Sequence, residues 1–191
     1  MGASSESGGS KSKRCQDFFI CVGIAAAVAG IVVGFTYMFD SFKTPIYTAT
    51  ITDVSGLDPE TDLRQQSRGP AGTLISPVFN LTVGVASHSR WEGARIGPGT
   101  SVKVSYSHLR LPMASGHVPD VRVGPRESRE LPSVVARGRD VAVPGFLMDS
   151  LAEEMRSGQA MFEVELIESD EYGWRDVAKG WGMVGDTIRL T

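Results

Sequence analysis

Three histidines are the side chains of this sequence suited to acid–base chemistry at neutral pH: His88, His108 and His117. His88 and His117 lie in turn-like segments, and His108 ends a predicted strand that also holds Ser105 and Ser107. A hydrolase would need one imidazole beside a nucleophile, and such triads assemble in space from distant residues. The sequence contains no G-x-S-x-G nucleophile elbow. We therefore interpret the histidines as surface or strand-end residues and expect no catalytic site.

The carboxylates form two adjacent pairs, Glu153–Glu154 and Asp170–Glu171. We expect the first pair on the exposed face of a helix and the second in a turn. Neither pair has the spacing of an EF-hand loop, no Cys/His set has zinc spacing, and no glycine-rich segment follows the phosphate-loop pattern. The sequence predicts neither a metal site nor a cofactor.

Two residues are candidates for covalent modification. Asn80 begins the N-glycosylation sequon Asn-Leu-Thr, and only a domain on the exoplasmic side of a membrane can receive a glycan there. Cys15 stands beside an apolar run, where cysteines are palmitoylated. The alternative for Cys15 is an ordinary juxtamembrane cysteine.

The longest apolar stretch of the chain is residues 18–39, FFICVGIAAAVAGIVVGFTYMF. As a helix it spans roughly 33 Å, the thickness of a hydrocarbon core with a little tilt. A secretory signal is the first alternative, with Ala25-Ala26-Ala27 as the cleavage site, but the apolar run continues twelve residues beyond Ala27. A buried core helix is the second, but it would carry a polar stripe. We expect an uncleaved transmembrane helix.

The flanking charges predict the orientation of this helix. Lys11, Lys13 and Arg14 precede it, and Lys43 is the one basic residue in the seventeen that follow it. Because basic residues stay on the cytoplasmic side, residues 1–17 should form a disordered, basic cytoplasmic tail. The rest of the chain would then be exoplasmic.

Small residues recur every four positions in the apolar stretch, at Ala26, Gly30 and Gly34. Membrane helices pack closely along such a face, so the pattern favours a homo-oligomer formed through this helix. The alternative is that Gly and Ala are simply common in membrane helices.

The composition excludes one class of function. The net charge of the chain is −3, and the 152 residues from Asp40 onward carry 16 Lys and Arg against 20 Asp and Glu, a net charge of −4. Nucleic-acid binding requires a basic surface, so we expect no nucleic-acid partner. Both cysteines, Cys15 and Cys21, lie in or beside the apolar run, so the remainder of the chain must be stabilised by packing alone.

Beyond a linker of residues 40–45, the period of hydrophobicity changes from helix to strand. Turn-forming segments separate the alternating runs, and one segment, Phe146–Arg156, has apolar residues at helical spacing before Gly158. The predicted strands are Ile46–Val54, Val78–Ser87, Val102–Tyr106, Val118–Val123, Arg129–Ala136, Phe162–Leu166 and two within Tyr172–Leu190. Residues 46–191 therefore predict a mostly β domain, an antiparallel β-sandwich of about seven strands with one crossover helix.

The same patterns predict which large side chains are buried. The alternation after Phe162 places Glu163 and Glu165 on the outer face of their strand. The sequence contains three tryptophans, Trp91, Trp174 and Trp181, which could mark a binding surface. Aromatic side chains of a sandwich usually lie in its core, and we expect these three to be core residues.

Five short motifs in a fixed order, after a basic tail and one apolar helix, resemble the plant late embryogenesis abundant group 2 family in its membrane-anchored, harpin-induced-like and disease-resistance-like branch. They are F-N-L-T-V at Phe79–Val83, V-x-V-x-Y at Val102–Tyr106, V-P-x-x-x-V-G-P at Val118–Pro125, V-x-V-P-x-x-L-x-D-x-L at Val141–Leu151 and F-x-V-x-L at Phe162–Leu166. The chain departs from the family at residues 86–89, which read Ala-Ser-His-Ser where members carry an Asn-Pro-Asn turn.

The resemblance implies a seven-stranded, fibronectin-like sandwich at the plasma membrane, with a role in pathogen defence or abiotic stress. It brings no catalytic residue. From the residues and the resemblance together we expect a non-enzymatic, single-pass membrane protein whose partners are the bilayer and proteins not identified by the sequence. The alternative is a tethered sandwich that binds lipid or another apolar ligand between its sheets.

Overall fold

The structure is a computed structural model that describes residues 9–41, 43–65, 73–106, 108–170 and 173–191. It divides into two compact units, residues 1–43 and residues 44–191, which are described separately. The first unit is helical and the second, the β-domain, contains every strand that the structure describes.

Helix α1 runs from Gly9 to Ser41, and within it residues Ile20–Asp40 are long and apolar enough to cross a membrane. Residues 20–39 of this span are all exposed, whereas the core helix of a soluble protein would be mostly buried. Its position near the N-terminus also suits a signal sequence. The prediction of a disordered tail up to Asp17 is wrong from Gly9 onward, because extending an existing helix costs far less than starting one and Lys, Arg and Gln are good helix formers.

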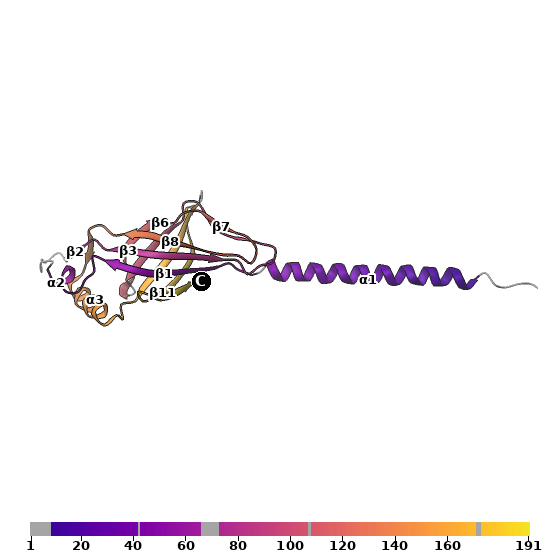
Figure 1. Cartoon of the computed structure of the whole chain (residues 1–191), viewed down its shortest axis with the longest axis horizontal. Helices are drawn as coiled ribbons and strands as arrows, with labels where there is room; N and C mark the ends of the chain where they lie inside the picture. The colour runs from indigo at the N-terminus through magenta and orange to yellow at the C-terminus, as the bar shows by residue number, and fades with distance from the viewer. Residues whose placement is uncertain (1–8, 42, 66–72, 107, 171–172) are drawn as a thin grey trace, which may run out of the picture. The chain divides into compact units, whose positions relative to one another are not determined.

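The β-domain is built on one antiparallel sheet of eight strands in the order β11-β10-β5-β6-β8-β3-β1-β12 (Figure 1). These strands are β1 (Ile46–Ser55), β3 (Val78–Ala86), β5 (Ser101–Tyr106), β6 (Leu111–His117), β8 (Ser128–Arg137), β10 (Phe162–Asp170), β11 (Gly173–Gly182) and β12 (Thr187–Leu190). Two small sheets pair β2 (Thr73–Ile75) with β9 (Val141–Val143) and β4 (Ala94–Ile96) with β7 (Val121–Val123).

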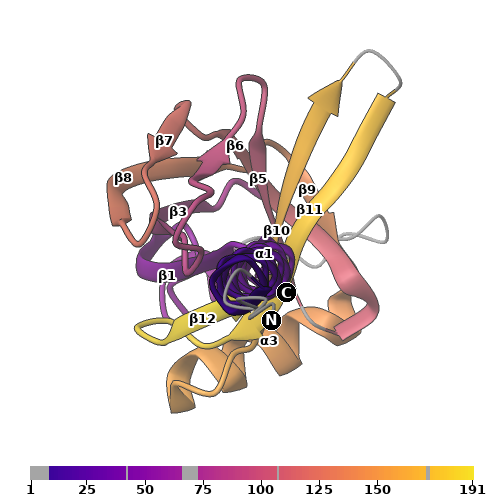
Figure 2. The same cartoon turned by 90° about the vertical axis from the view of Figure 1, so that its right-hand side faces the viewer.

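The sheet curls until its first and last strands nearly meet, as the end-on view in Figure 2 shows. The N–H of Thr191, one residue past β12, donates to the carbonyl of Lys179 in β11 at 2.9 Å, and the N–H of Lys179 donates back to Thr191 at 3.3 Å. The predicted fold class, mostly β and antiparallel, is confirmed. The architecture is a nearly closed barrel, however, and the prediction of about seven strands in a sandwich matches it only roughly.

The two ends of the barrel are defined by strand register. Ile46 at the start of β1 lies opposite Ala86 at the end of β3, and Ala86 lies opposite Ser128 at the start of β8. We call this the proximal end. At the distal end, Ser55 of β1 lies opposite Val78 of β3.

The barrel interior is filled by apolar side chains. Phe79, Tyr106 and Phe162 are fully buried, and the rings of Phe79 and Phe162 meet edge to face with centroids 5.2 Å apart. Val83 and Leu166 belong to the same continuous core. Because the domain holds no cysteine, this apolar packing is its main source of stability.

Three short helical segments join the strands: α2 (Asp62–Gln65), the 3₁₀ turn η1 (His108–Arg110) and α3 (Gly145–Ser157). Helix α3 buries Leu147, Met148 and Leu151 and lies at the distal end of the domain with α2 and β2 (Figure 1). It ends where Gly158 turns left-handed at φ 69°, as the sequence predicts.

Candidate functional site

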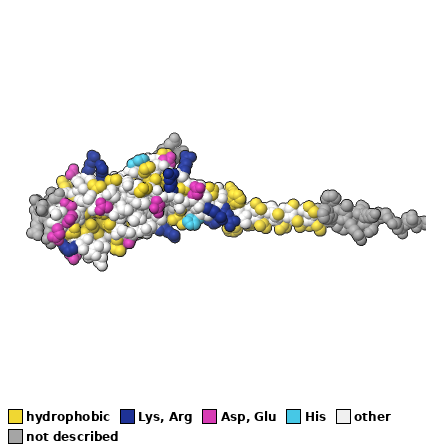
Figure 3. Space-filling view, viewed as in Figure 1, with side chains coloured by type: hydrophobic (Ala, Val, Ile, Leu, Met, Phe, Trp, Pro, Cys, Tyr) yellow, Lys and Arg dark blue, Asp and Glu magenta, His cyan; other side chains and the backbone are white. Residues whose placement is uncertain are grey.

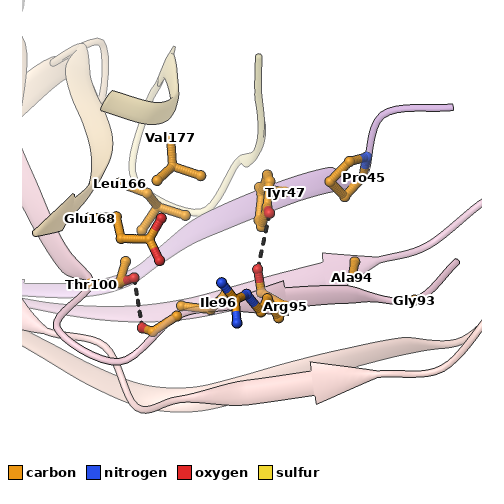
Figure 4. Close-up of a pocket in the computed structure, with 11 residues that line it drawn as sticks. Pro45, Tyr47, Gly93, Ala94, Arg95, Ile96, Thr100, Leu166, Glu168 and Val177 are labelled. Carbon is orange, nitrogen blue, oxygen red and sulfur yellow. Dashed lines mark hydrogen bonds between the residues drawn. The ribbon is translucent and has the colours of Figure 1, made fainter. Parts of the chain in front are cut away.

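A cavity of about 260 Å³ opens at the proximal end of the barrel (Figure 4). Pro45 and Tyr47 line it from the start of β1, and residues 93–97 line it from β4 and the loops on either side. Leu166 and Val177 close the side formed by β10 and β11. Mouths of β-barrels are common places for ligand sites, and we take this mouth cavity as the candidate functional site.

Two hydrogen bonds hold the wall formed by β4. The hydroxyl of Tyr47 donates to the carbonyl of Arg95 at 3.1 Å, and the buried hydroxyl of Thr100 donates to the carbonyl of Gly97 at 2.8 Å. Both bonds are drawn in Figure 4. The first ties β4 to β1 and the second ties it to the start of β5, so the wall is fixed before any ligand binds.

A charged group of each sign belongs to the cavity: the exposed Arg95 and the half-buried Glu168. A Cβ atom added at Gly97 would lie 2.0 Å from Oε1 of Glu168, so the absence of a side chain at Gly97 leaves room for the carboxylate. The apolar part of the wall is supplied by Ile96 and Leu166. Such a cavity can bind a group that is partly apolar and carries a charge or a hydrogen-bonding end.

The two histidines whose side chains the structure describes do not assemble a catalytic group. His88 is exposed in the loop after β3, and His117 is exposed at the end of β6. Within the described chain, neither imidazole has a hydrogen bond or an ion pair with another side chain. The side chain of His108 lies outside the described residues.

The first carboxylate pair is only partly on the surface, contrary to the prediction. Glu153 is exposed and forms an ion pair with Arg156. Glu154 is half-buried, and its carboxylate lies near the hydroxyl of Tyr106. Burial, a hydrogen bond to Glu154 and the negative charge of Glu154 together raise the pKa of Tyr106. The prediction failed because Tyr106 of the barrel brings a polar group under α3.

The structure does not describe the side chains of the second predicted carboxylate pair, Asp170–Glu171. Among the His, Cys, Asp and Glu residues that it does describe, no group of three or more is placed to hold a metal ion.

Asn80, the glycosylation candidate, lies in β3 between β1 and β8 and is half-buried. Its side-chain amide nitrogen donates to Oδ2 of Asp53 at 3.3 Å, and its backbone carbonyl accepts a hydrogen bond from the hydroxyl of Thr52 at 2.9 Å. The amide that would carry a sugar is thus engaged with the neighbouring strand, and glycosylation stays a prediction.

The candidates of the apolar segment all lie within α1. The side chain of Cys15 is outside the described residues, and palmitoylation stays a prediction. A Cβ atom added at Gly30 or Gly34 would meet nothing within 4 Å. The face formed by these glycines and Ala26 is therefore open in the single chain, and its use in self-association also stays a prediction.

Two expectations about burial are wrong. Trp91 is 60% exposed and Trp181 is 50% exposed, whereas the sequence analysis places them in the core. The side chain of Trp174 is outside the described residues. Glu163 faces away from the core but is only 1% exposed, because Arg110 of η1 lies over it. For Trp91 a signal was present: Trp91 stands between Arg90 and Glu92, outside any alternating run.

Comparisons with family models, with curated proteins and with solved structures find no match for this chain.

Proposed function

We propose that this chain is a single-pass membrane protein whose exoplasmic β-barrel binds protein partners at the mouth cavity and catalyses no reaction. The observation that carries the proposal is the combination of a filled barrel interior with a preformed, partly polar cavity at one end. Such a cavity can recognise a protruding side chain or chain end of a partner. The described residues that line it include no His, Cys, Ser or Lys, and the hydroxyl of Thr100 donates to the carbonyl of Gly97 rather than to a base.

The membrane part of the proposal is supported by the Ile20–Asp40 span. With basic residues before the span and Lys43 after it, the N-terminus faces the cytosol and the barrel faces outward, at the plasma membrane. A tether confines the barrel to a surface and raises its effective concentration toward partners there. The motif order supports membership in the late embryogenesis abundant group 2 family and a role in defence or stress.

The alternative function is the binding of an apolar ligand, and a different place in the domain suits it. Phe79, Tyr106 and Phe162 occupy the interior in which such a ligand would lie. A groove of about 270 Å³ beside the end of α3, lined in part by Met155 and Val184, is the most apolar of the described cavities. An apolar ligand would bind there rather than inside the barrel.

The test of partner binding is site-specific photo-crosslinking in membranes. A photoreactive amino acid at Arg95, on the rim of the mouth cavity, is compared with one at Thr187, which is exposed on the outer face of β12. We expect one defined protein to be crosslinked from position 95 and not from position 187. The variant Gly97→Val would push the Glu168 carboxylate from its place, and we expect it to abolish that crosslinked product. Identical products from both positions would contradict the proposal.

A further inference from the structure

An exposed tryptophan lies on a tightly built loop at the proximal end of the barrel. Trp91 belongs to the loop between β3 and β4, and 60% of its surface is exposed. Tryptophan combines an apolar ring with a polar N–H, and tryptophans gather where one end of a site is apolar and the other is wet. This side chain is not part of the mouth cavity.

The loop around Trp91 is fixed by hydrogen bonds to a buried serine, Ser89. The hydroxyl of Ser89 accepts hydrogen bonds from the N–H groups of Trp91 and Glu92 at 3.1 and 3.0 Å. The carbonyl of Ser89 accepts one from the N–H of Arg126 at 3.1 Å, which joins this loop to the turn before β8. Ser87 donates its N–H to the carbonyl of Glu127 at 2.9 Å. Trp91 is thus presented by a rigid loop, and little entropy is lost if it binds.

Three exposed arginines lie on the same or adjoining segments: Arg90 beside Trp91 in the loop, Arg95 in β4 and Arg126 in the turn that a hydrogen bond joins to the carbonyl of Ser89. Figure 3 shows Lys and Arg side chains together with hydrophobic ones at the right-hand end of the β-domain. The acidic neighbours are Glu92, Glu127 and Glu168, the last of which lines the mouth cavity with Arg95. Oε2 of Glu127 accepts a hydrogen bond from the N–H of Gly124 at 2.8 Å within its own turn. We call Arg90, Trp91, Arg95 and Arg126 the proximal patch.

The covalent chain limits how far this patch can lie from a bilayer. Strand β1 starts at the proximal end, and Ile46 follows Asp40, the last residue of the candidate span, after five residues. The six residue steps from Asp40 to Ile46 reach at most about 22 Å when fully extended. If α1 spans the membrane, the proximal end therefore stays close to the headgroups.

We propose that the proximal patch docks on the phospholipid surface, with Trp91 inserted at the level of the headgroups and the arginines on lipid phosphates. Tryptophan is enriched at that depth, and the planar guanidinium of arginine binds phosphate groups through paired hydrogen bonds. Docking would hold the barrel in one orientation on the membrane. This inference rests on the membrane anchor of the proposed function but not on partner binding at the mouth cavity.

The experiment measures the fluorescence of Trp91 in the full chain reconstituted into phosphatidylcholine vesicles, with and without brominated lipid. In the variant W174F/W181F, Trp91 is the one tryptophan. The matched control is W91F/W174F/W181F with Phe146→Trp, since Phe146 is 68% exposed on α3 at the distal end. We expect brominated lipid to quench Trp91 about twofold or more and to leave position 146 unchanged.

Charge is tested by adding R90E and R126E to the Trp91 reporter in the same phosphatidylcholine vesicles. We expect weaker quenching than in the parent, and equal quenching would overturn the role of the arginines. A blue-shifted Trp91 that bromine does not quench would place the indole against protein, such as a second copy, and overturn the inference.

Insertion of α1 is measured separately, by resistance of the full chain to carbonate extraction. An inserted chain with unquenched Trp91 overturns docking alone, whereas an extracted chain overturns docking and the proposed anchor together.

Discussion

Nε of Arg110 lies 3.7 Å from Oε2 of Glu163, and the two residues differ sharply in exposure. The side chain of Arg110 is 67% exposed, whereas that of Glu163 is 1% exposed. The other carboxylate oxygen, Oε1, has no hydrogen-bond partner in the described structure. A buried carboxylate needs a counter-charge, so Arg110 covers and neutralises Glu163 from the solvent side.

We predict that Arg110→Ala lowers the free energy of unfolding by about 1–2 kcal/mol, because it leaves the Glu163 carboxylate buried without its cation and the pair is partly screened by solvent. The double variant R110A/E163Q should recover most of this loss. Urea unfolding of the full chain in detergent measures both, with Arg122→Ala on β7 as the exposed control. A loss that E163Q does not reverse would contradict the ion-pair explanation.

The titration of Tyr106 should make the stability of the β-domain fall at alkaline pH. Its pKa is raised in the folded state by burial and by Glu154. Below an unfolded pKa of about 10 both states keep the phenolic proton, so the contribution of Tyr106 is constant there. Above about pH 10 the unfolded chain releases that proton while the folded chain retains it, so stability falls as the pH rises.

We therefore expect Tyr106→Phe to lose less stability than the parent between about pH 8 and about pH 11, although it is less stable by about 1 kcal/mol at neutral pH. Urea unfolding at both pH values gives the comparison. An identical pH dependence in the two proteins would show that Tyr106 does not titrate as described.

The contact between Phe79 and Phe162 predicts a large packing effect. Both rings are fully buried, and Phe162 also packs against Tyr106 at a centroid distance of 6.1 Å. Phe162→Ala should cost about 3–5 kcal/mol through lost burial and a residual cavity, and Phe162→Leu much less. Thermal unfolding ranks the variants, and equal melting temperatures for the two would contradict a packed interior.

Hydrogen bonds to Ser89 should keep the Trp91 loop rigid. Ser89→Ala removes the acceptor for two N–H groups, those of Trp91 and Glu92. We expect amide hydrogen exchange at residues 91 and 92 to become about fivefold faster, corresponding to about 1 kcal/mol. Ser150→Ala, on the exposed face of α3, serves as the control and should leave exchange in this loop unchanged.

The sequence predicts several local elements of this protein because their signals are local, but it misses β6, whose residues Leu-Pro-Met-Ala-Ser-Gly-His show no clear alternation. The alternation of Phe79, Leu81 and Val83 follows from a half-buried strand, and β3 is found there. The apolar spacing before Gly158 predicts α3 nearly to its ends.

Closure of the barrel could not be predicted in this way, since it depends on Lys179 meeting Thr191 across the fold. Burial of Glu163 depends likewise on η1, where Leu109 and Arg110 adopt positive φ angles of 61° and 48°. The mouth cavity and the proximal patch arise from loops far apart in sequence, joined by hydrogen bonds such as that between Tyr47 and Arg95. Periodicity carries no information about such contacts.

The central claim, an uncleaved helix that holds the barrel at a membrane, is tested most directly by fractionating cells that express the full chain. After carbonate extraction, the pellet and the supernatant are analysed by intact mass and N-terminal sequencing. The account predicts a chain of about 20.5 kDa that retains residues 1–40 and stays in the membrane pellet. A chain that begins after Ala27 and appears in the supernatant would contradict it.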